Sequence, residues 1–253
     1  MDPRAGSDDP SFVAATRFAG AIAWCELPRD DVAQMVPQAL RLPPATRARG
    51  DRHPVVFIFG QHDRSAVVFA SLTVRTGARF HEMVIGVPFV HGPDGAGPSL
   101  FVSRVFSGEP VATWSGNAHY GYTKRLVPME WLGDTFVVSD EGGTLLAHVA
   151  VEPAGDWERT ANSTLPAHTA TVALSRLPVL GQRPDGQLVR SRFEWSFADG
   201  WTRALQASVH IDAPLGPGLG CGVHHAAGDS VEVSGMGWRL SWPESGHDPS
   251  SAS

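Results

Sequence analysis

Lysine is almost missing from this sequence. The 253-residue chain has a single lysine, Lys124, against 19 arginines, and it contains only two tyrosines and two cysteines. A bias toward arginine wherever any cation suffices would explain the ratio. It also singles out Lys124, because arginine stays protonated whereas a lysine amine can lose its proton and attack a carbonyl group.

Long apolar runs and clusters of positive charge are also lacking. No apolar stretch reaches the length of a transmembrane helix, and the polar, acidic start MDPRAGSDDPSF has neither the basic nor the apolar region of a signal peptide. The arginines are scattered and the formal net charge is −6, so no basic stripe indicates binding to nucleic acid or to an anionic membrane. We therefore expect a cytoplasmic protein without nucleic-acid or membrane partners.

The cysteines and paired histidines do not indicate a redox or metal site. Cys25 and Cys221 could pair only once, and in a reducing cytosol both are expected to be buried thiols. The adjacent His224 and His225 would point to opposite faces of a strand, and no cysteine or aspartate stands at ligand spacing from them. We expect no metal and no cofactor.

Strand-forming patterns, by contrast, are abundant. Apolar residues make up 42% of the chain and charged residues 18%, which suits a β-rich domain better than a charged helical bundle. Hairpins are expected around Glu141-Gly142-Gly143 and around GQRPDGQ. A few short helices and about ten strands predict a mainly β (α+β) fold, with a strongly curved antiparallel sheet or a closed β-barrel or cone. The strands are expected over residues 55–60, 66–76, 79–90, 99–106, 135–139, 145–151, 171–180, 188–197, 203–211 and 231–242.

The two ends of the chain lack this pattern. Residues 1–11 and 244–253 are polar and are expected to be disordered tails, which leaves 12–243 as a single domain. A helix with an aspartate cap is expected over 30–37. A second helix, or a helix and turn, is expected over 109–124, with Pro110 in its first turn.

The segment Gly116–Leu126, GNAHYGYTKRL, gathers the side chains with the most chemistry. It holds the only lysine, both tyrosines and His119. Tyr120 and Lys124 would share one face if the segment were helical. Tyr122 and Lys124 would share one face if it were extended. The tyrosines and His119 could donate protons to an enolate or carbonyl oxygen, or they could simply pack in the core.

A free lysine amine could carry out covalent chemistry in this segment. Burial, or the neighbouring cation of Arg125, disfavours the charged ammonium form. The uncharged amine of Lys124 can form a Schiff base with a ketone, and the iminium then accepts electrons from the adjacent carbon. Spacing alone also fits a surface Lys-Arg pair flanked by core tyrosines.

This segment resembles the catalytic segment of the acetoacetate decarboxylase family, in which a glycine and an aromatic-rich stretch precede a Lys-cation-Leu triplet. On this resemblance Lys124 takes the place of the Schiff-base lysine, and Arg125 that of its cationic neighbour. A second match, RFHE at residues 79–82 leading into VIGVPF, resembles a family strand and places Glu82 on an acidic residue near the lysine. The resemblance covers roughly residues 12–243.

The resemblance implies an acetoacetate decarboxylase-like fold and a homo-oligomeric lyase. Its substrate would be an oxo acid or related small-molecule carbonyl compound, converted by decarboxylation or by aldol or dehydration chemistry, in specialised metabolism. Together with the chemistry of the segment itself, this predicts Lys124, Glu82, Tyr120 and Tyr122 as catalytic residues. It predicts Arg125, His119 and Arg17 as substrate-binding residues.

Some positions depart from the family pattern. Asn117 and Ala118 replace an Arg-Glu pair, and Ala70 falls where the family has an earlier acid. The arginine that binds the substrate carboxylate falls near Phe18, with Arg17 adjacent. These departures leave two alternatives open. The pocket could serve a cyclisation or rearrangement without an imine, or the protein could bind a small molecule without turning it over.

Overall fold

The chain is built mostly of strands, over the residues that the computed structural model describes: 12–45, 50–69, 72–75, 77–93, 95 and 97–245. The first nine strands are β1 (Phe12–Pro28), β2 (Arg52–Phe69), β3 (Leu72–Arg75), β4 (Phe80–Val90), β5 (Ser99–Ser107), β6 (Lys124–Leu126), β7 (Met129–Leu132), β8 (Thr135–Ser139) and β9 (Leu145–Pro153). The others are β10 (Glu158–Arg159), β11 (Val179–Gln182), β12 (Leu188–Ser191), β13 (Phe193–Ser196), β14 (Trp201–Ile211), β15 (Gly222–His225), β16 (Val231–Ser241) and β17 (Glu244–Ser245).

Short helices connect some of these strands. They are α1 (Arg29–Met35), α2 (Pro110–His119), α3 (Pro166–Ser175) and the 3₁₀ helix η1 (Thr160–Asn162). Within the described ranges, no helix has the length and apolar character needed to cross a bilayer.

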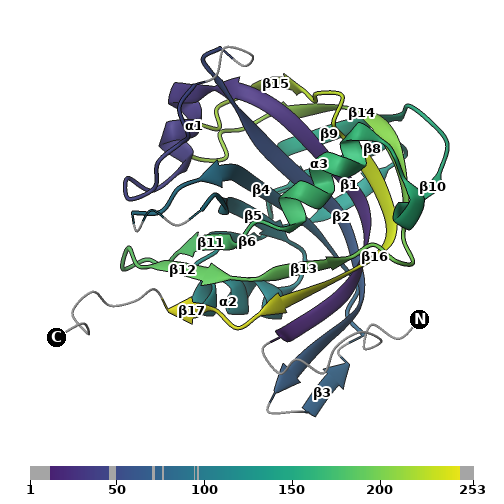
Figure 1. Cartoon of the computed structure of the whole chain (residues 1–253), viewed down its shortest axis with the longest axis horizontal. Coiled ribbons are helices and arrows are strands. Elements are labelled where there is room, and N and C mark those ends of the chain that lie inside the picture. Colours follow the sequence, from purple (N-terminus) through teal and green to yellow (C-terminus); the bar gives the residue numbers. More distant parts are fainter. Residues whose placement is uncertain are drawn as a thin grey trace.

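One strongly curled sheet forms a half-barrel (Figure 1). Its neighbouring strands run β5, β4, β2, β1, β16, β14, β9 and β8, all antiparallel. Strand β14 turns the sheet, because residues 201–204 pair with β16 whereas 205–211 pair with β9. The prediction of a mainly β, strongly curved sheet is therefore confirmed.

The long strands β1 and β2 are buried on both faces. Successive residues of a strand point to opposite sides of the sheet. In β1, Ala21 and Ala23 join one apolar cluster, while Ile22 and Trp24 join the other. A strand covered on both faces is apolar at successive positions. One of the two clusters surrounds the cavity described below.

The sheet is mixed, whereas the sequence predicted an antiparallel one. Strand β5 runs parallel to both β6 and β11. Parallel neighbours require a crossover connection of a dozen or more residues, usually through a helix. Helix α2 lies in the connection between β5 and β6, and this crossover lets β6 run in the same direction as β5.

Two predicted elements are wrong in type or extent. Residues 171–175, predicted as strand, belong to α3, in which Ala167, Thr171 and Leu174 are buried at helical spacing. Their β-branched neighbours favoured the strand interpretation. The helix predicted over 109–124 ends at His119, so Lys124 begins strand β6.

Other boundaries differ less. Helix α1 begins at Arg29 without a side-chain cap, so the predicted aspartate cap is wrong. Glu244 and Ser245, expected in the C-terminal tail, form β17 against β12. The expected tails at 1–11 and 246–253 lie outside the described residues. Both predicted hairpins are present, as β8–β9 and β11–β12.

Gly20 and Gly60 let β1 and β2 approach each other closely. They stand opposite each other in the register. A Cβ added at Gly20 would lie 2.7 Å from Cα of Gly60 and would collide with the carbonyl oxygen of Phe59. Neither obstacle is a flexible side chain, so the backbone itself would have to move.

We expect Gly20→Ala to lower the free energy of unfolding by about 3 kcal/mol, because overpacking in a buried strand pair strains the backbone. Urea denaturation measures the change. Gly155→Ala is the matched control, since an added Cβ there meets nothing within 4 Å. Equal stabilities of the two variants would contradict the prediction.

Candidate active site

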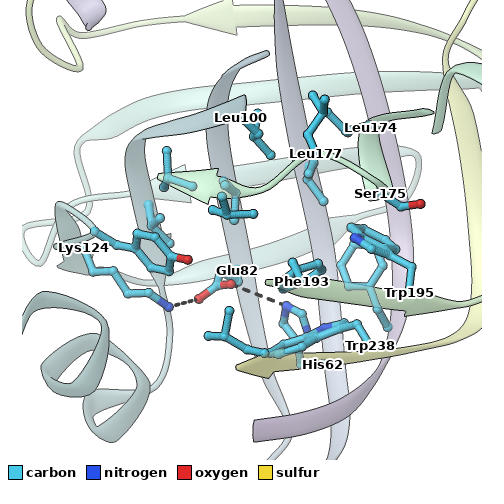
Figure 2. A pocket seen from close by; sticks show the side chains of 18 residues that line it. His62, Glu82, Leu100, Lys124, Leu174, Ser175, Leu177, Phe193, Trp195 and Trp238 are labelled. Carbon is cyan, nitrogen blue, oxygen red and sulfur yellow. Dashed lines mark hydrogen bonds and ion pairs between the residues drawn. The ribbon is translucent and has the colours of Figure 1, made fainter. Parts of the chain in front are cut away.

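Lys124 and Glu82 form a buried ion pair. The Nζ atom of Lys124 lies 2.6 Å from Oε1 of Glu82, and each side chain is 10% exposed. Two strands that flank β5 carry them, with Lys124 opposite Val105 on one side and Glu82 opposite Ser107 on the other. The two side chains therefore meet across a shared neighbouring strand (Figure 2).

Asn117 on α2 fixes the backbone of Lys124. Its side-chain oxygen accepts a hydrogen bond from the amide of Lys124 at 2.7 Å, and its side-chain nitrogen donates to the Lys124 carbonyl at 2.9 Å. This two-point contact ties the start of β6 to the preceding helix. Asn117 is one of the departures from the family pattern, and here it positions the lysine.

Gly116 leaves room for the Lys124 side chain, because it has no Cβ atom. A Cβ added at Gly116 would lie 2.5 Å from Cε and 2.6 Å from Cδ of Lys124. The Gly116 carbonyl also accepts hydrogen bonds from the amides of Tyr120 and Tyr122 as the helix ends. The aliphatic part of Lys124 thus packs directly against the bare backbone of α2.

His62, on β2, contacts the other oxygen of Glu82. Its Nε2 atom lies 3.7 Å from Oε2, and its Nδ1 atom accepts a hydrogen bond from the indole nitrogen of Trp238 at 3.1 Å. An indole N–H can only donate, so Nδ1 carries no proton and the neutral ring bears its proton on Nε2. Trp238 therefore selects the tautomer that directs an N–H toward Glu82.

Opposing effects set the charges in this cluster. Burial, reinforced by the Lys124 cation, lowers the pKa of His62 to about 4 although Glu82 opposes the shift, so the ring is neutral at pH 7. Burial alone would raise the pKa of Glu82, but attraction to Lys124 and His62 and the hydrogen bond from Lys124 outweigh it and hold that pKa below its ordinary value. Glu82 is therefore a carboxylate in its ion pair with Lys124.

The ion pair opens into a largely apolar cavity of about 100 Å³. Figure 2 shows Lys124 at one end and Trp195 at the other, with Glu82 between them. The lining residues are Phe18, Ile58, His62, Glu82, Val84, Leu100, Val102, Val105, Tyr122, Lys124, Leu174, Ser175, Leu177, Val179, Phe193, Trp195, Trp238 and Leu240. This volume exceeds that of a single water and is large enough for a small organic molecule.

Tyr122 contributes the phenol to the cavity lining. Its hydroxyl lies 2.9 Å from the hydroxyl of Ser191, and either group can be the donor. Burial raises the pKa of the Tyr122 hydroxyl, so it stays protonated at neutral pH. Tyr122 lies in a tight turn before β6, in which the Lys124 amide donates a hydrogen bond to the Tyr122 carbonyl at 2.7 Å, and the side chains of both residues line the cavity.

The remaining predicted site residues lie outside the cavity lining. Tyr120 stacks on Tyr122 with ring centroids 5.5 Å apart, and His119 packs between two tryptophans at the end of α2. Arg125 follows Lys124 and is exposed. Arg17 precedes Phe18 in β1, so these two neighbours face opposite sides, and it is Phe18 that lines the cavity.

Several other positions bear on the sequence predictions. Ala70, the expected position of a second acid, lies outside the described residues. Cys25 is buried as expected, but Cys221 is exposed because it lies in the turn before β15. Among the described residues, no three histidines, cysteines, aspartates or glutamates are grouped so that they could hold a metal ion.

Comparison with solved structures places this arrangement in a known architecture. The enduracididine biosynthesis enzyme MppR, bound to the condensation product of pyruvate and imidazole 4-carboxaldehyde, has a TM-score of 0.64 at 13% identity, covering 92% of this chain and 88% of that chain. Acetoacetate decarboxylase from Legionella pneumophila has a TM-score of 0.63 at 15% identity, covering 99% and 96%. The chain has the acetoacetate decarboxylase-like fold. An acetoacetate decarboxylase-like enzyme from Sphingomonas wittichii gives 0.62 at 13% identity, covering 94% and 93%.

Comparison at the level of sequence identifies no relative of this chain. No protein-family model matches the chain, and a search of curated proteins finds no match. Identities of 13–15% with the acetoacetate decarboxylase-like structures leave only the fold in common. The chemistry of this site has to be argued from its own residues.

Sequence reasoning missed His62 and Trp238. His62 lies at the polar end of an otherwise apolar strand, a position that is ordinary for a surface histidine. Trp238 is 176 positions away along the chain and reaches His62 only through the pairing of β16 with β1 and of β1 with β2. The one feature of the sequence that could have indicated His62 was its polar side chain in a strand that is otherwise apolar at successive positions.

We expect Gly116→Ala to displace the Lys124 amine from Glu82. The added methyl meets a flexible side chain, which moves aside more easily than backbone, but the displaced amine leaves the buried Glu82 carboxylate without its cation. The melting temperature should therefore fall, and in the folded variant reductive labelling of Lys124 by a carbonyl probe should fall by about tenfold or more. Unchanged labelling would show that the space left by Gly116 does not position the Lys124 amine.

His62 should make the protein less stable as the pH falls. Its folded pKa is depressed from 6.5 to about 4, so its contribution is fully present above pH 6.5 and is lost as the pH falls from about 6.5 to about 4. Between pH 7 and pH 5 this amounts to about 2 kcal/mol. Urea denaturation of wild type and His62→Gln at pH 7 and pH 5 should show that the free energy of unfolding falls less in the variant. Equal losses would contradict the assignment.

Proposed function

We propose that this protein is a lyase that acts on a small carbonyl compound through an imine on Lys124. The observation that carries the proposal is the position of the only lysine, at the end of an apolar cavity and 2.6 Å from Glu82. The outcome would be carbon–carbon chemistry of the decarboxylase or aldolase–dehydratase kind, on an oxo acid or related carbonyl compound.

In this proposal Glu82 accepts the proton that Lys124 must lose. The ammonium is not a nucleophile, and its Nζ already contacts Oε1 of the carboxylate. Transfer of one proton to Glu82 yields the free amine, which attacks the carbonyl carbon. Two further hydrogens from the adduct leave with the carbonyl oxygen as one water, and the resulting imine can take the proton back to become an iminium.

The groups around the pair support this sequence of steps. The neutral His62 directs an N–H toward Oε2 of Glu82 at 3.7 Å. The protonated hydroxyl of Tyr122 lines the same cavity and can donate to the oxygen that departs. The iminium would remain beside the Glu82 carboxylate, which stabilises its positive charge.

Proteins with this fold support an enzyme of this kind by analogy. MppR has been solved with pyruvate and with a condensation product of pyruvate and an aromatic aldehyde, and others with this fold are acetoacetate decarboxylases. The analogy concerns carbonyl substrates and leaves the particular reaction open.

Borohydride reduction should trap the imine as a permanent adduct on Lys124. Because the chain has one lysine, only the N-terminal amine competes, and peptide mapping separates the two. With a ketone or aldehyde that fits the cavity, wild type should gain one adduct at Lys124, whereas Lys124→Arg should gain none there. If no ketone, aldehyde or oxo acid labels Lys124, the imine mechanism is wrong.

A further inference from the structure

The cavity is electrically balanced before a substrate enters. Among the described residues that line it, the only side chains charged at neutral pH are Lys124 and Glu82, and they contact each other at 2.6 Å. The proposed iminium would keep the same positive charge in the same place. Neither state leaves a cation for a further anion to pair with.

An oxo acid would therefore bring an uncompensated charge into this space. A carboxylate held close to Lys124 would also lie close to Glu82, which repels it. Taking an unpaired carboxylate out of water into an apolar site is strongly unfavourable. Arg17 and Arg125 lie outside the described lining, so neither supplies the missing cation there.

A continuous aromatic wall begins beside His62 and extends to the end of the cavity away from Lys124. The ring centroids of Phe18 and Trp195 are 6.3 Å apart in an edge-to-face arrangement. The ring centroid of Phe193 lies 5.2 Å from that of Trp195 and 4.8 Å from that of Trp238, on which Phe193 stacks. Leu174 and Leu177 lie at the same end in Figure 2. Such a surface gains most from a flat or branched apolar group.

We infer that the substrate is an uncharged aldehyde or ketone whose carbonyl carbon reaches Lys124 and whose aryl or branched alkyl group lies against Phe18, Phe193 and Trp195. This inference rests on the proposed imine at Lys124. It excludes decarboxylation, since a substrate without a carboxylate has no carbon dioxide to release. Of the reactions proposed above, aldol or dehydration chemistry remains.

The aldol reaction balances without a cofactor. The iminium loses a proton from the neighbouring carbon to the Glu82 carboxylate and becomes an enamine. The enamine carbon bonds to the carbonyl carbon of a second aldehyde, which restores the iminium, and the aldehyde oxygen takes the proton from Glu82 and becomes a hydroxyl group. Water then attacks the iminium, releases the product and restores the Lys124 amine.

Two matched probes test the substrate class. In 4-phenylbutan-2-one a methyl group occupies the position that a carboxylate occupies in 2-oxo-4-phenylbutanoate, and the rest of the two molecules is the same. The oxo acid is intrinsically the better electrophile, so reactivity alone favours it. We expect half-maximal borohydride labelling of Lys124 at a concentration at least about tenfold lower for the neutral ketone.

The outcomes separate this inference from the proposed function. Labelling of Lys124 by the oxo acid at equal or lower concentration would overturn the substrate class and leave the imine standing. Labelling by neither probe, nor by any other carbonyl compound, would overturn the imine. Calorimetric binding of 4-phenylbutan-2-ol and 2-hydroxy-4-phenylbutanoate would still test the preference for an uncharged ligand.

A pair of tryptophan variants tests the aromatic wall. Trp195→Ala should weaken labelling by 4-phenylbutan-2-one by about tenfold and leave labelling by acetone unchanged, because acetone has no group that reaches the wall. Trp157→Ala, at a tryptophan outside the cavity lining, should change neither. Equal effects of Trp195→Ala on both ketones would contradict the assigned orientation, and melting temperatures verify that both variants fold.

Discussion

A lysine and a glutamate in contact inside an apolar cavity are the interaction on which the rest of this site depends. Removing two charges from water costs several kcal/mol for each ion, and their attraction recovers that cost only when the geometry is good. The surroundings supply that geometry: Asn117 holds the Lys124 backbone, Gly116 leaves room for its side chain, and His62 faces the free oxygen of Glu82. An apolar pair of similar size often stabilises a fold as well or better, and this favours the proposed chemical role of the pair.

The half-barrel makes this arrangement possible by burying strands on both faces. One face of β1 and β2 packs into a solid core, and the other faces the cluster that contains the cavity. The crossover through α2 then returns the chain parallel to β5, so that Lys124 arrives beside the strand that also neighbours Glu82. A purely antiparallel connection would have brought β6 back in the opposite direction and changed which of its side chains reach the cavity.

Much of the fold and part of the site could be predicted from sequence. Strand-forming runs, two hairpins and the segment around Lys124 are local patterns, and local patterns are what sequence reasoning detects. Helix α3 was mistaken for a strand because its β-branched residues outweighed a helical spacing that only burial reveals. The contact between Trp238 and His62 was missed because it depends on three strands being aligned in register.

The sequence by itself determined that the chain is a curved β domain and that Lys124 is its one amine able to act as a side-chain nucleophile. Only the tertiary structure decided which neighbours that amine has. Alternation along a strand assigns Phe18 rather than Arg17, and Lys124 rather than Arg125, to the cavity, and a shift of one residue would reverse both choices. Sequence order cannot fix that choice, because it depends on which face of each strand the rest of the sheet encloses.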